Sequence, residues 1–226
     1  MKLGILFSGG KDSTLALARA MEKEEVSCLI TLVSENKESY MFHTPNIQLA
    51  ELQAEAIGLP LIKKQTKGEK EAELADLEDA IKEAVEKHKI EGVVTGAVQS
   101  IYQAVRVQKI CDKLGLYCFN PVWLLDQKKL LEEVLERGFE VIVSGFYAEP
   151  FSEKWLGRKL DKQAVTELLE LSEKYSISPA GEGGEIETTV LDAPFFKKKI
   201  VVASSEKQVS ASSGTLVINN AELVQK

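Results

Sequence analysis

Short apolar runs alternate with amphipathic stretches along the first half of the chain. Most of the runs have few polar residues, which is typical of strands buried on both faces of a parallel sheet, and the run at 61–66 is the weaker one. The stretches between them repeat apolar residues at helical spacing and are long enough to connect parallel strands. The pattern predicts strands at 3–7, 27–34, 61–66, 92–95 and 116–119, and helices at 13–25, 47–57, 71–88 and 100–114. It therefore indicates an α/β fold with a doubly wound parallel sheet.

The regular alternation stops near Pro121 and Trp123. The following segment predicts a smaller, mixed α+β part that begins with a helix and a strand and ends in antiparallel strands. Its expected elements are helices at 127–137 and 163–175, a strand at 139–146, a loop rich in Gly and Glu, and strands at 200–203, 208–212 and 215–218 with a turn at 212–214. We therefore expect two domains, 1–122 and 123–226.

Composition narrows the class of protein. The chain has 226 residues, 44% of them hydrophobic, with a formal net charge of -7. A chain of this length buries a large core without metals or disulfides, and its acidic balance argues against a nucleic-acid partner. The three cysteines form no C-x-x-C pair, and no stretch resembles a signal peptide or a membrane span. We expect a soluble protein in the reducing cytoplasm, with no membrane partner.

The turn SGGKDS, residues 8–13, follows the first predicted strand and opens the first predicted helix. Ligands of parallel sheets bind at this end of the strands. The two glycines allow backbone conformations that point several N–H groups at one anion. Asp12 and Ser13 open the helix, whose unsatisfied N–H groups favour negative charge, and Lys11 adds a mobile cation. The turn therefore predicts a phosphate site.

The spacing of this turn matches neither a Walker A loop nor G-x-G-x-x-G. It resembles the PP-loop, SGGxDS, of the N-type ATP pyrophosphatases. The resemblance implies a HUP-like fold with ATP as cofactor, in which the loop holds the β,γ-pyrophosphate while a substrate attacks the α-phosphorus. Asp12 beside phosphates makes sense if it binds Mg²⁺ or orients Lys11, so Asp12 is the candidate metal ligand.

Four further stretches resemble the archaeal diphthine–ammonia ligases, and the resemblance spans nearly the whole chain. They are SYMFHTPN (39–46), GAVQSIYQAVRVQKICDKLGL (96–116), WLGRKLD (155–161) and GEGGEIETTVLDAPFF (181–196). The resemblance implies ATP-dependent amidation of diphthine, a trimethylammonio-modified histidine of translation elongation factor 2, to diphthamide. Ammonium would supply the nitrogen, and an acyl-adenylate would be the intermediate. The resemblance does not fix the oligomeric state, and a homodimer is possible.

Three glutamates crowd the glycine-rich segment: Glu182, Glu185 and Glu187. In an extended chain Glu185 and Glu187 point to the same face, so their charges repel unless a cation lies between them. The trimethylammonium group, an ammonium ion and a metal are the candidate cations. A carboxylate could also act as the base that converts ammonium to ammonia. A solvated acidic turn is the alternative without function.

Other candidate residues follow from their positions and from the resemblance. Gly96 ends the fourth strand, where a missing side chain lets a nucleotide approach, and Tyr102 and Arg106 share one helix face. The expected catalytic residues are Lys11, Asp12, Glu182, Glu185 and Glu187. The expected ATP-binding set is Ser8, Gly9, Gly10, Lys11, Asp12, Ser13, Val33, His43 and Gly96, and the expected substrate-binding set is Tyr102, Arg106, Glu185, Glu187 and Thr188.

Two other functions fit the turn. One is a different PP-loop enzyme, such as a tRNA-modifying adenylating enzyme, which the acidic charge disfavours. The other is a non-catalytic adenine-nucleotide sensor similar in fold to the universal stress proteins, which would not need clustered glutamates. Turnover of ATP separates the sensor from both enzymes.

Overall fold

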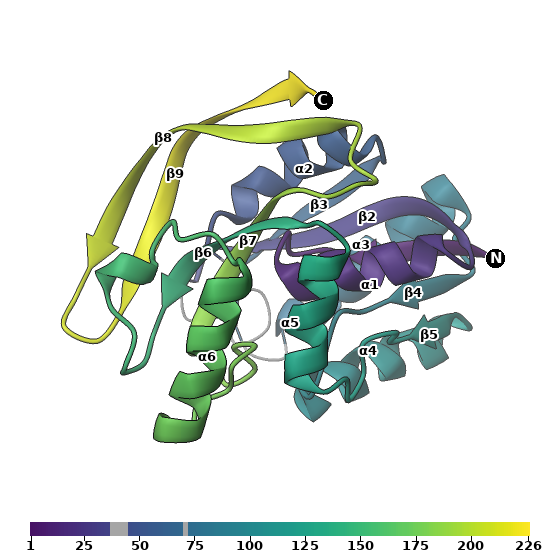
Figure 1. Cartoon of the computed structure of the whole chain (residues 1–226). Coiled ribbons are helices and arrows are strands. Elements are labelled where there is room, and N and C mark those ends of the chain that lie inside the picture. Colours follow the sequence, from purple (N-terminus) through teal and green to yellow (C-terminus); the bar gives the residue numbers. More distant parts are fainter. Residues whose placement is uncertain (37–44, 70–71) are drawn as a thin grey trace.

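The protein contains a five-stranded and a four-stranded sheet (Figure 1). The computed structural model describes residues 1–36, 45–69 and 72–226. In Figure 1 the N-terminal strands, drawn in purple and blue, lie beside the first helices. The long C-terminal hairpin, drawn in yellow-green and yellow, runs up the left side of the view and passes over the helix labelled α2 at the top.

The first sheet is parallel, with the strand order β3-β2-β1-β4-β5. Its side chains alternate between two apolar layers: Leu3 and Ile5 face one layer, and Ile30 and Leu32 face the other. Both faces are therefore buried, as the apolar runs predict. The strands are β1 (Lys2–Leu6), β2 (Glu25–Ser34), β3 (Leu61–Thr66), β4 (Gly92–Val94) and β5 (Tyr117–Phe119).

Helices cover both faces of this sheet. Two of them, α1 and α2, pack on the layer that contains Ile5, and α3 and α4 pack on the opposite layer. The predicted doubly wound sheet is confirmed. The elements are α1 (Lys11–Met21), a 3₁₀ turn at Ile47–Leu49, α2 (Ala50–Ile57), α3 (Ala72–His88) and α4 (Ile101–Leu114).

The second sheet is antiparallel, with the order β7-β6-β9-β8. Its strands are β6 (Glu140–Phe146), β7 (Ile186–Asp192), β8 (Lys198–Val209) and β9 (Gly214–Gln225). The helices of this part are α5 (Gln127–Glu136), a 3₁₀ turn at Glu153–Trp155 and α6 (Lys162–Tyr175). Of the helices in the described ranges, none is long and apolar enough to cross a membrane.

One apolar core joins the two sheets. The cluster that contains Ile5 and Leu17 continues through α5 and the second sheet to α6, where Leu168 is fully buried. The two parts of the chain therefore share a core, although each has its own sheet. The division of the chain at residue 122 stays a prediction.

Several expected element boundaries differ from the structure, and the expected strand at 215–218 is part of the longer β9. The first helix ends at Met21, and Glu25 already begins β2. The glycine- and glutamate-rich loop gives way at Ile186 to β7, whose β-branched IETTVLD sequence suits a strand. The expected strand at 200–203 and the first two residues of that at 208–212 belong to one strand, β8, while residues 210–212 lie in the turn before β9. The sequence hides the continuity of β8 because its outer residues are exposed on both faces and show no alternation.

The shared core predicts that both parts unfold together. Leu168→Ala should lower the free energy of unfolding by about 2–5 kcal/mol because it leaves a cavity in that core. Denaturation followed by tryptophan fluorescence reports the second part, which carries Trp123 and Trp155, and far-ultraviolet circular dichroism reports both parts. We expect the two curves to coincide for the parent and the variant.

The matched control is Ile101→Ala, at a position that is 69% exposed, and its stability should stay within about 0.5 kcal/mol of the parent. Two separate transitions, with only the fluorescence curve moved by Leu168→Ala, would show that the parts fold independently.

Candidate active site

A cavity of about 570 Å³ opens at the carboxyl ends of β1 and β4. One wall is apolar and contains Leu6, Ile30, Leu32, Leu77 and Val107. The other carries charge and contains Ser8, Lys11, Asp12, Ser13, Glu182 and Glu187. Its place is that expected for a ligand of a parallel sheet, and its two walls suit a molecule with one apolar and one charged end.

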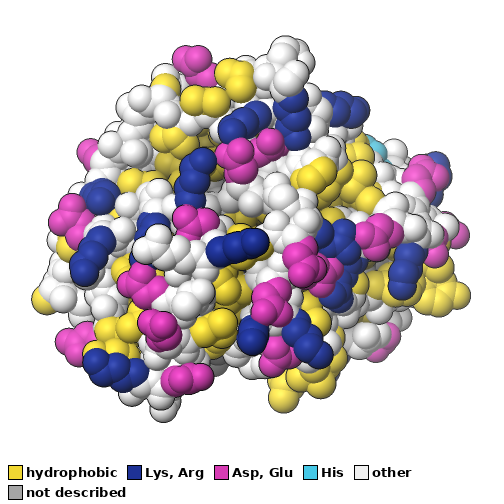
Figure 2. Space-filling view, viewed as in Figure 1, with side chains coloured by type: hydrophobic (Ala, Val, Ile, Leu, Met, Phe, Trp, Pro, Cys, Tyr) yellow, Lys and Arg dark blue, Asp and Glu magenta, His cyan; other side chains and the backbone are white. Residues whose placement is uncertain are grey.

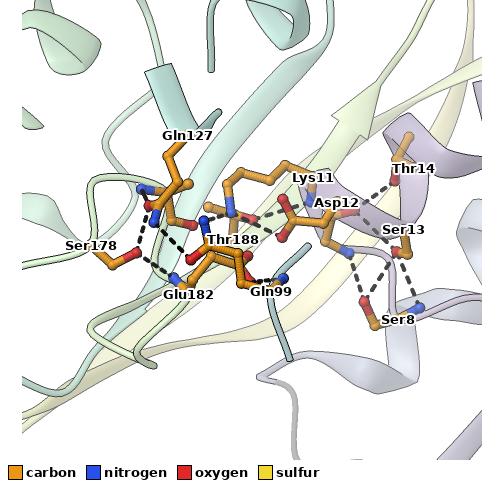
Figure 3. Close-up of polar contacts among 12 residues, drawn as sticks. Ser8, Lys11, Asp12, Ser13, Thr14, Gln99, Gln127, Ser178, Glu182 and Thr188 are labelled. Atoms are coloured by element: carbon orange, nitrogen blue, oxygen red, sulfur yellow. Dashed lines mark hydrogen bonds and ion pairs between the residues drawn. The ribbon is translucent and has the colours of Figure 1, made fainter. Parts of the chain in front are cut away.

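The SGGKDS turn, called the PP-loop below, forms the charged end. Helix α1 starts at Lys11, and its first helical hydrogen bond runs from Thr14 N–H to the Gly10 carbonyl at 3.1 Å. Ser13 Oγ lies 3.1 Å from Ser8 Oγ and closes the turn (Figure 3). No described residue accepts a hydrogen bond from the N–H of Asp12 or Ser13. These two groups at a helix N-terminus are the donors available to an anion.

Strand β7 is hydrogen-bonded directly to the PP-loop. Val190 N–H donates to the Gly9 carbonyl at 2.9 Å, and Lys11 N–H donates to Thr188 Oγ1 at 3.2 Å. The Gln53 amide on α2 bridges the same parts, donating to the carbonyls of Gly9 (2.9 Å) and Val190 (2.8 Å). A Cβ on Gly9, whose φ is +78°, would lie 2.0 Å from Gln53 Oε1. The second sheet therefore fixes the phosphate site of the first.

Lys11 is buried at this junction, with 2% of its surface exposed. Its Nζ donates to Asp12 Oδ2 at 3.0 Å and to the Ala180 carbonyl (Figure 3). Burial lowers the pKa of Lys11, but the charges of Asp12 and Glu182 outweigh burial and hold that pKa above its ordinary value. Lys11 therefore remains a cation inside the cavity.

Glu182 and Glu187 face the cavity as a second charged group. Burial, strengthened by the charge of Asp12, raises the pKa of Glu182 to about 7. Burial likewise raises the pKa of Glu187 to about 7, with Lys11 opposing the shift. Gln99 N–H donates to Glu182 Oε2 at 3.2 Å, whereas no described residue donates to the Glu187 carboxylate. Both groups can gain or lose a proton near neutral pH.

Glu185 has a different place from the one expected. Its carboxylate accepts from Ser178 N–H at 2.8 Å and from Gly183 N–H at 2.9 Å, within the turn that precedes β7. It does not line the cavity. Since β7 begins only at Ile186, strand alternation does not extend to Glu185. The structure therefore places Glu187 with Glu182, and not with Glu185, in the cavity.

Gly96 lines the cavity, as expected for a strand end beside a nucleotide. A Cβ there would lie 2.8 Å from the backbone N and Cα of Ser13, so close packing against α1 already requires glycine. Val33 does not line the cavity: it pairs with Gln65 of β3, and strand alternation gives the cavity wall to Leu32 instead. His43 lies outside the described residues.

Tyr102 and Arg106 do not line the cavity either. The Arg106 guanidinium carbon lies 3.5 Å from the centroid of the Tyr102 ring, and Arg106 borders a smaller hollow between α3 and α4. Gln103 and Val107, which directly follow Tyr102 and Arg106, face the cavity instead. One residue along a helix turns the side chain by about 100°, so the expected pair lies on the neighbouring face of α4.

Sequence reasoning missed a set of glutamines that hold the site. Gln127, the first residue of α5, accepts from Ser178 Oγ and from Ala180 N–H (3.0 Å), and its amide nitrogen lies 3.5 Å from Gln99 Oε1 (Figure 3). Through Ala180 this network reaches the Lys11 ammonium. A lone glutamine in a helix carries no sequence signal, because the residue is common on helix surfaces.

Comparison with known families decides which group of proteins this site belongs to. Residues 1–118 match the family model described as the diphthamide synthase N-terminal domain, and residues 126–224 match the diphthamide synthase C-terminal domain. The chain belongs to the diphthamide synthase family. The two matches together cover the PP-loop and β7, so both walls of the cavity lie inside the family's domains.

Relatives in this family are described as diphthine–ammonia ligases. The protein of Rattus norvegicus is 36% identical over 234 residues, which cover 94% of this chain and 86% of the rat protein. That of Homo sapiens is 35% identical, covering 91% and 84%. In Schizosaccharomyces pombe the identity is 36%, covering 95% of this chain but 38% of the longer yeast protein. These matches establish the family. The relatives named here come from animals and fungi, so they do not support the expected archaeal origin.

A solved structure described as a predicted subunit of tRNA methyltransferase from Methanocaldococcus jannaschii matches with a TM-score of 0.45 and 17% identity, covering 86% of this chain and 98% of that one. This likeness is too low to bear on function.

The raised pKa of Glu187 predicts a pH-dependent stability. Its ordinary value is 4.5 and the folded value is about 7, so between these pH values the folded protein keeps a proton that the unfolded chain has lost. Stability from this group is present below about pH 4.5 and is lost as the pH rises through about 7. Glu187→Gln cannot ionise. It should be more stable than the parent near pH 8 by on the order of 1–3 kcal/mol, and equal to it near pH 4.5.

Chemical denaturation of both proteins at the two pH values measures this difference. Glu136→Gln, at an exposed position of α5, is the matched control and should change stability at neither pH. A Glu187→Gln variant that is no more stable than the parent near pH 8 would show that the Glu187 carboxylate is not destabilised in the cavity.

Proposed function

We propose that this protein is an ATP-dependent diphthine–ammonia ligase, which joins ammonia to the carboxylate of diphthine on elongation factor 2 and releases AMP and pyrophosphate. One observation carries the proposal: β7 is hydrogen-bonded to the PP-loop, so the phosphate site and two proton-exchanging carboxylates share one cavity. Membership of the diphthamide synthase family supports the choice of substrate.

In the first step the substrate carboxylate attacks the α-phosphorus of ATP, and pyrophosphate leaves. The N–H groups of Asp12 and Ser13 receive the departing phosphates, and Lys11 offsets negative charge in the same place. Asp12 orients Lys11 through the 3.0 Å ion pair. Because Lys11 is fixed before the reaction by Asp12 and the Ala180 carbonyl, it needs no reorientation as charge develops.

The residues present suit Mg²⁺ at Asp12. Its Oδ1 is buried and accepts no hydrogen bond from the described residues, and Mg²⁺ is usually held by one or two carboxylates together with phosphate oxygens. Asp12 would hold the ion through this oxygen. When bound, Mg²⁺ supplies further charge neutralisation on the phosphates. No group of three or more metal-binding side chains lies in the described parts of the chain, which suits an ion carried with ATP.

In the second step Glu182 takes a proton from ammonium, and the ammonia formed attacks the acyl carbon. A C–N bond forms, the C–O bond to AMP breaks, and AMP leaves with the bonding electron pair. The attacking nitrogen gives up a second proton to water at the opening of the cavity, which leaves the neutral amide. Glu182 suits this role because its pKa of about 7 lets it accept a proton, and because the adjacent Gly183 and Gly184 are exposed at the opening of the cavity.

The proposal also fixes where the protein works. Elongation factor 2 is a translation factor, so we place the reaction in the cytoplasm, where the three free cysteines remain reduced. Ammonium is the second substrate.

Release of AMP and pyrophosphate from MgATP tests the function. Sustained release should require both ammonium and diphthine-bearing elongation factor 2. Release that ignores the elongation factor would contradict the substrate and favour another PP-loop enzyme. Nucleotide binding without any AMP would contradict catalysis and favour a nucleotide sensor.

A Lys11→Met variant should lower AMP release by about 100-fold or more, because it removes a charge that stabilises the phosphates in the transition state. Methionine keeps most of the buried volume. Lys128→Met, an exposed lysine of α5, should leave the rate unchanged. A Lys11→Met enzyme that keeps more than a tenth of the parent rate would contradict the role of Lys11.

A further inference from the structure

Strand β6 changes register beside Glu187. Val143 pairs with Thr188 of β7, but Gly145 pairs with Glu187, so Ser144 is an extra residue in a β-bulge. Bulges often lie beside functional sites, where they redirect a side chain. Here the strand ends at Phe146, and the N–H of the next residue, Tyr147, donates to the Glu185 carbonyl at 2.9 Å. The bulge therefore sets the position of Tyr147 relative to β7. Figure 1 shows strands β6 and β7 side by side.

The Tyr147 ring folds back over Gly145. A Cβ on Gly145 would lie 2.9 Å from Cε2 and from Oη of Tyr147. The Tyr147 hydroxyl also lies 3.2 Å from Oγ1 of Thr215, which pairs with Gly145 from the other side. The ring thus occupies the face of the sheet on which a side chain at position 145 would stand.

Glu187 lies on that same face. Side chains of directly opposed residues in antiparallel strands lie on one face with Cβ atoms ~5 Å apart, and Glu187 is the residue opposed to Gly145. The Tyr147 ring therefore lies beside the Glu187 side chain. Consistently, burial raises the pKa of Tyr147, and the charge of Glu187 raises that pKa further.

A carboxylate beside an aromatic face suits one class of cation. No described residue donates a hydrogen bond to Glu187, and Tyr147 is 38% exposed. A metal ion held by one carboxylate also needs phosphate or other oxygens, and a primary ammonium has three N–H groups to satisfy, whereas this pair offers one carboxylate and a tyrosine hydroxyl already beside Thr215 Oγ1. A quaternary ammonium has no N–H donor and binds to aromatic faces together with a negative charge.

We propose that Tyr147 and Glu187 form a binding site for a quaternary ammonium group and, resting on the proposed function, for the trimethylammonium of diphthine. Glu187 also lines the cavity that holds Lys11 and the PP-loop. Because the trimethylammonium and the reacting carboxylate belong to one side chain, binding the cation here turns the carboxylate toward the phosphates. Glu182 is left as the base. The site also favours full methylation, since an unmethylated ammonium would find one carboxylate for its three N–H donors and would lose more water than these hydrogen bonds replace.

Choline and 3,3-dimethylbutan-1-ol, its neutral isostere, are the probes that test the site without elongation factor. Calorimetric titration of the parent protein should detect choline binding. The parent should bind the isostere at least about tenfold more weakly than choline. Tyr147→Leu should lower the affinity for choline by about tenfold. Tyr147→Phe, which keeps the ring, should lower that affinity by less than about twofold. Tyr117→Leu, at a tyrosine of β5 that is 61% exposed, is the matched control and should bind choline as the parent does.

Kinetics with diphthine-bearing elongation factor 2 give the second measurement. Tyr147→Leu should raise the KM for the elongation factor about tenfold and leave the KM for ATP within about twofold, which also shows that the variant is folded. Equal choline binding by the parent and Tyr147→Leu, or equal binding of the isostere, would overturn the site even if the ligase reaction is observed. Choline binding that depends on Tyr147, in a protein that fails to amidate diphthine, would overturn the proposed function and leave the site standing.

Discussion

The hydrogen bonds between the Gly9 carbonyl and the second sheet are the contact on which the site depends. That carbonyl accepts from Val190 N–H and from the Gln53 amide, so strand β7 and helix α2 meet at the PP-loop. A buried carbonyl without partners would be costly, and here both donors come from segments distant in sequence. Without this contact the phosphate site would belong to one sheet, and the carboxylates of the second sheet would have no fixed distance from it.

The electrostatics of the cavity follow from that junction. Lys11 enters a space that also contains Asp12, Glu182 and Glu187, where burial favours neutral forms and opposite charges favour ionised ones. Lys11 and Asp12 form an ion pair. The pKa values of Glu182 and Glu187 rise to about 7. The cavity thus carries less negative charge than its composition suggests. Protonation of these carboxylates lowers the negative charge that a polyanionic nucleotide would meet in a protein whose net charge is -7.

Local patterns in the sequence predict the first sheet and the phosphate turn. The apolar runs place all five strands of that sheet, and the six residues of SGGKDS identify a phosphate site, because both depend on neighbours in sequence. The junction could not be predicted in the same way. Lys11 and Thr188 are 177 residues apart, and a single glutamine such as Gln53 has no recognisable pattern. Glu185 was misplaced for a local reason: strand alternation was extended one residue beyond the true start of β7.

The central claim is that the diphthine carboxylate itself attacks the α-phosphorus in the cavity shared by the two sheets. Mass spectrometry of AMP, after reaction of elongation factor 2 whose diphthine carboxylate carries ¹⁸O in both positions, tests this most directly. One labelled oxygen should pass to the phosphate of AMP for each diphthamide formed, and the other should stay in the amide. Unlabelled AMP, or label recovered in pyrophosphate or inorganic phosphate, would contradict the adenylation step and the arrangement of the site built on it.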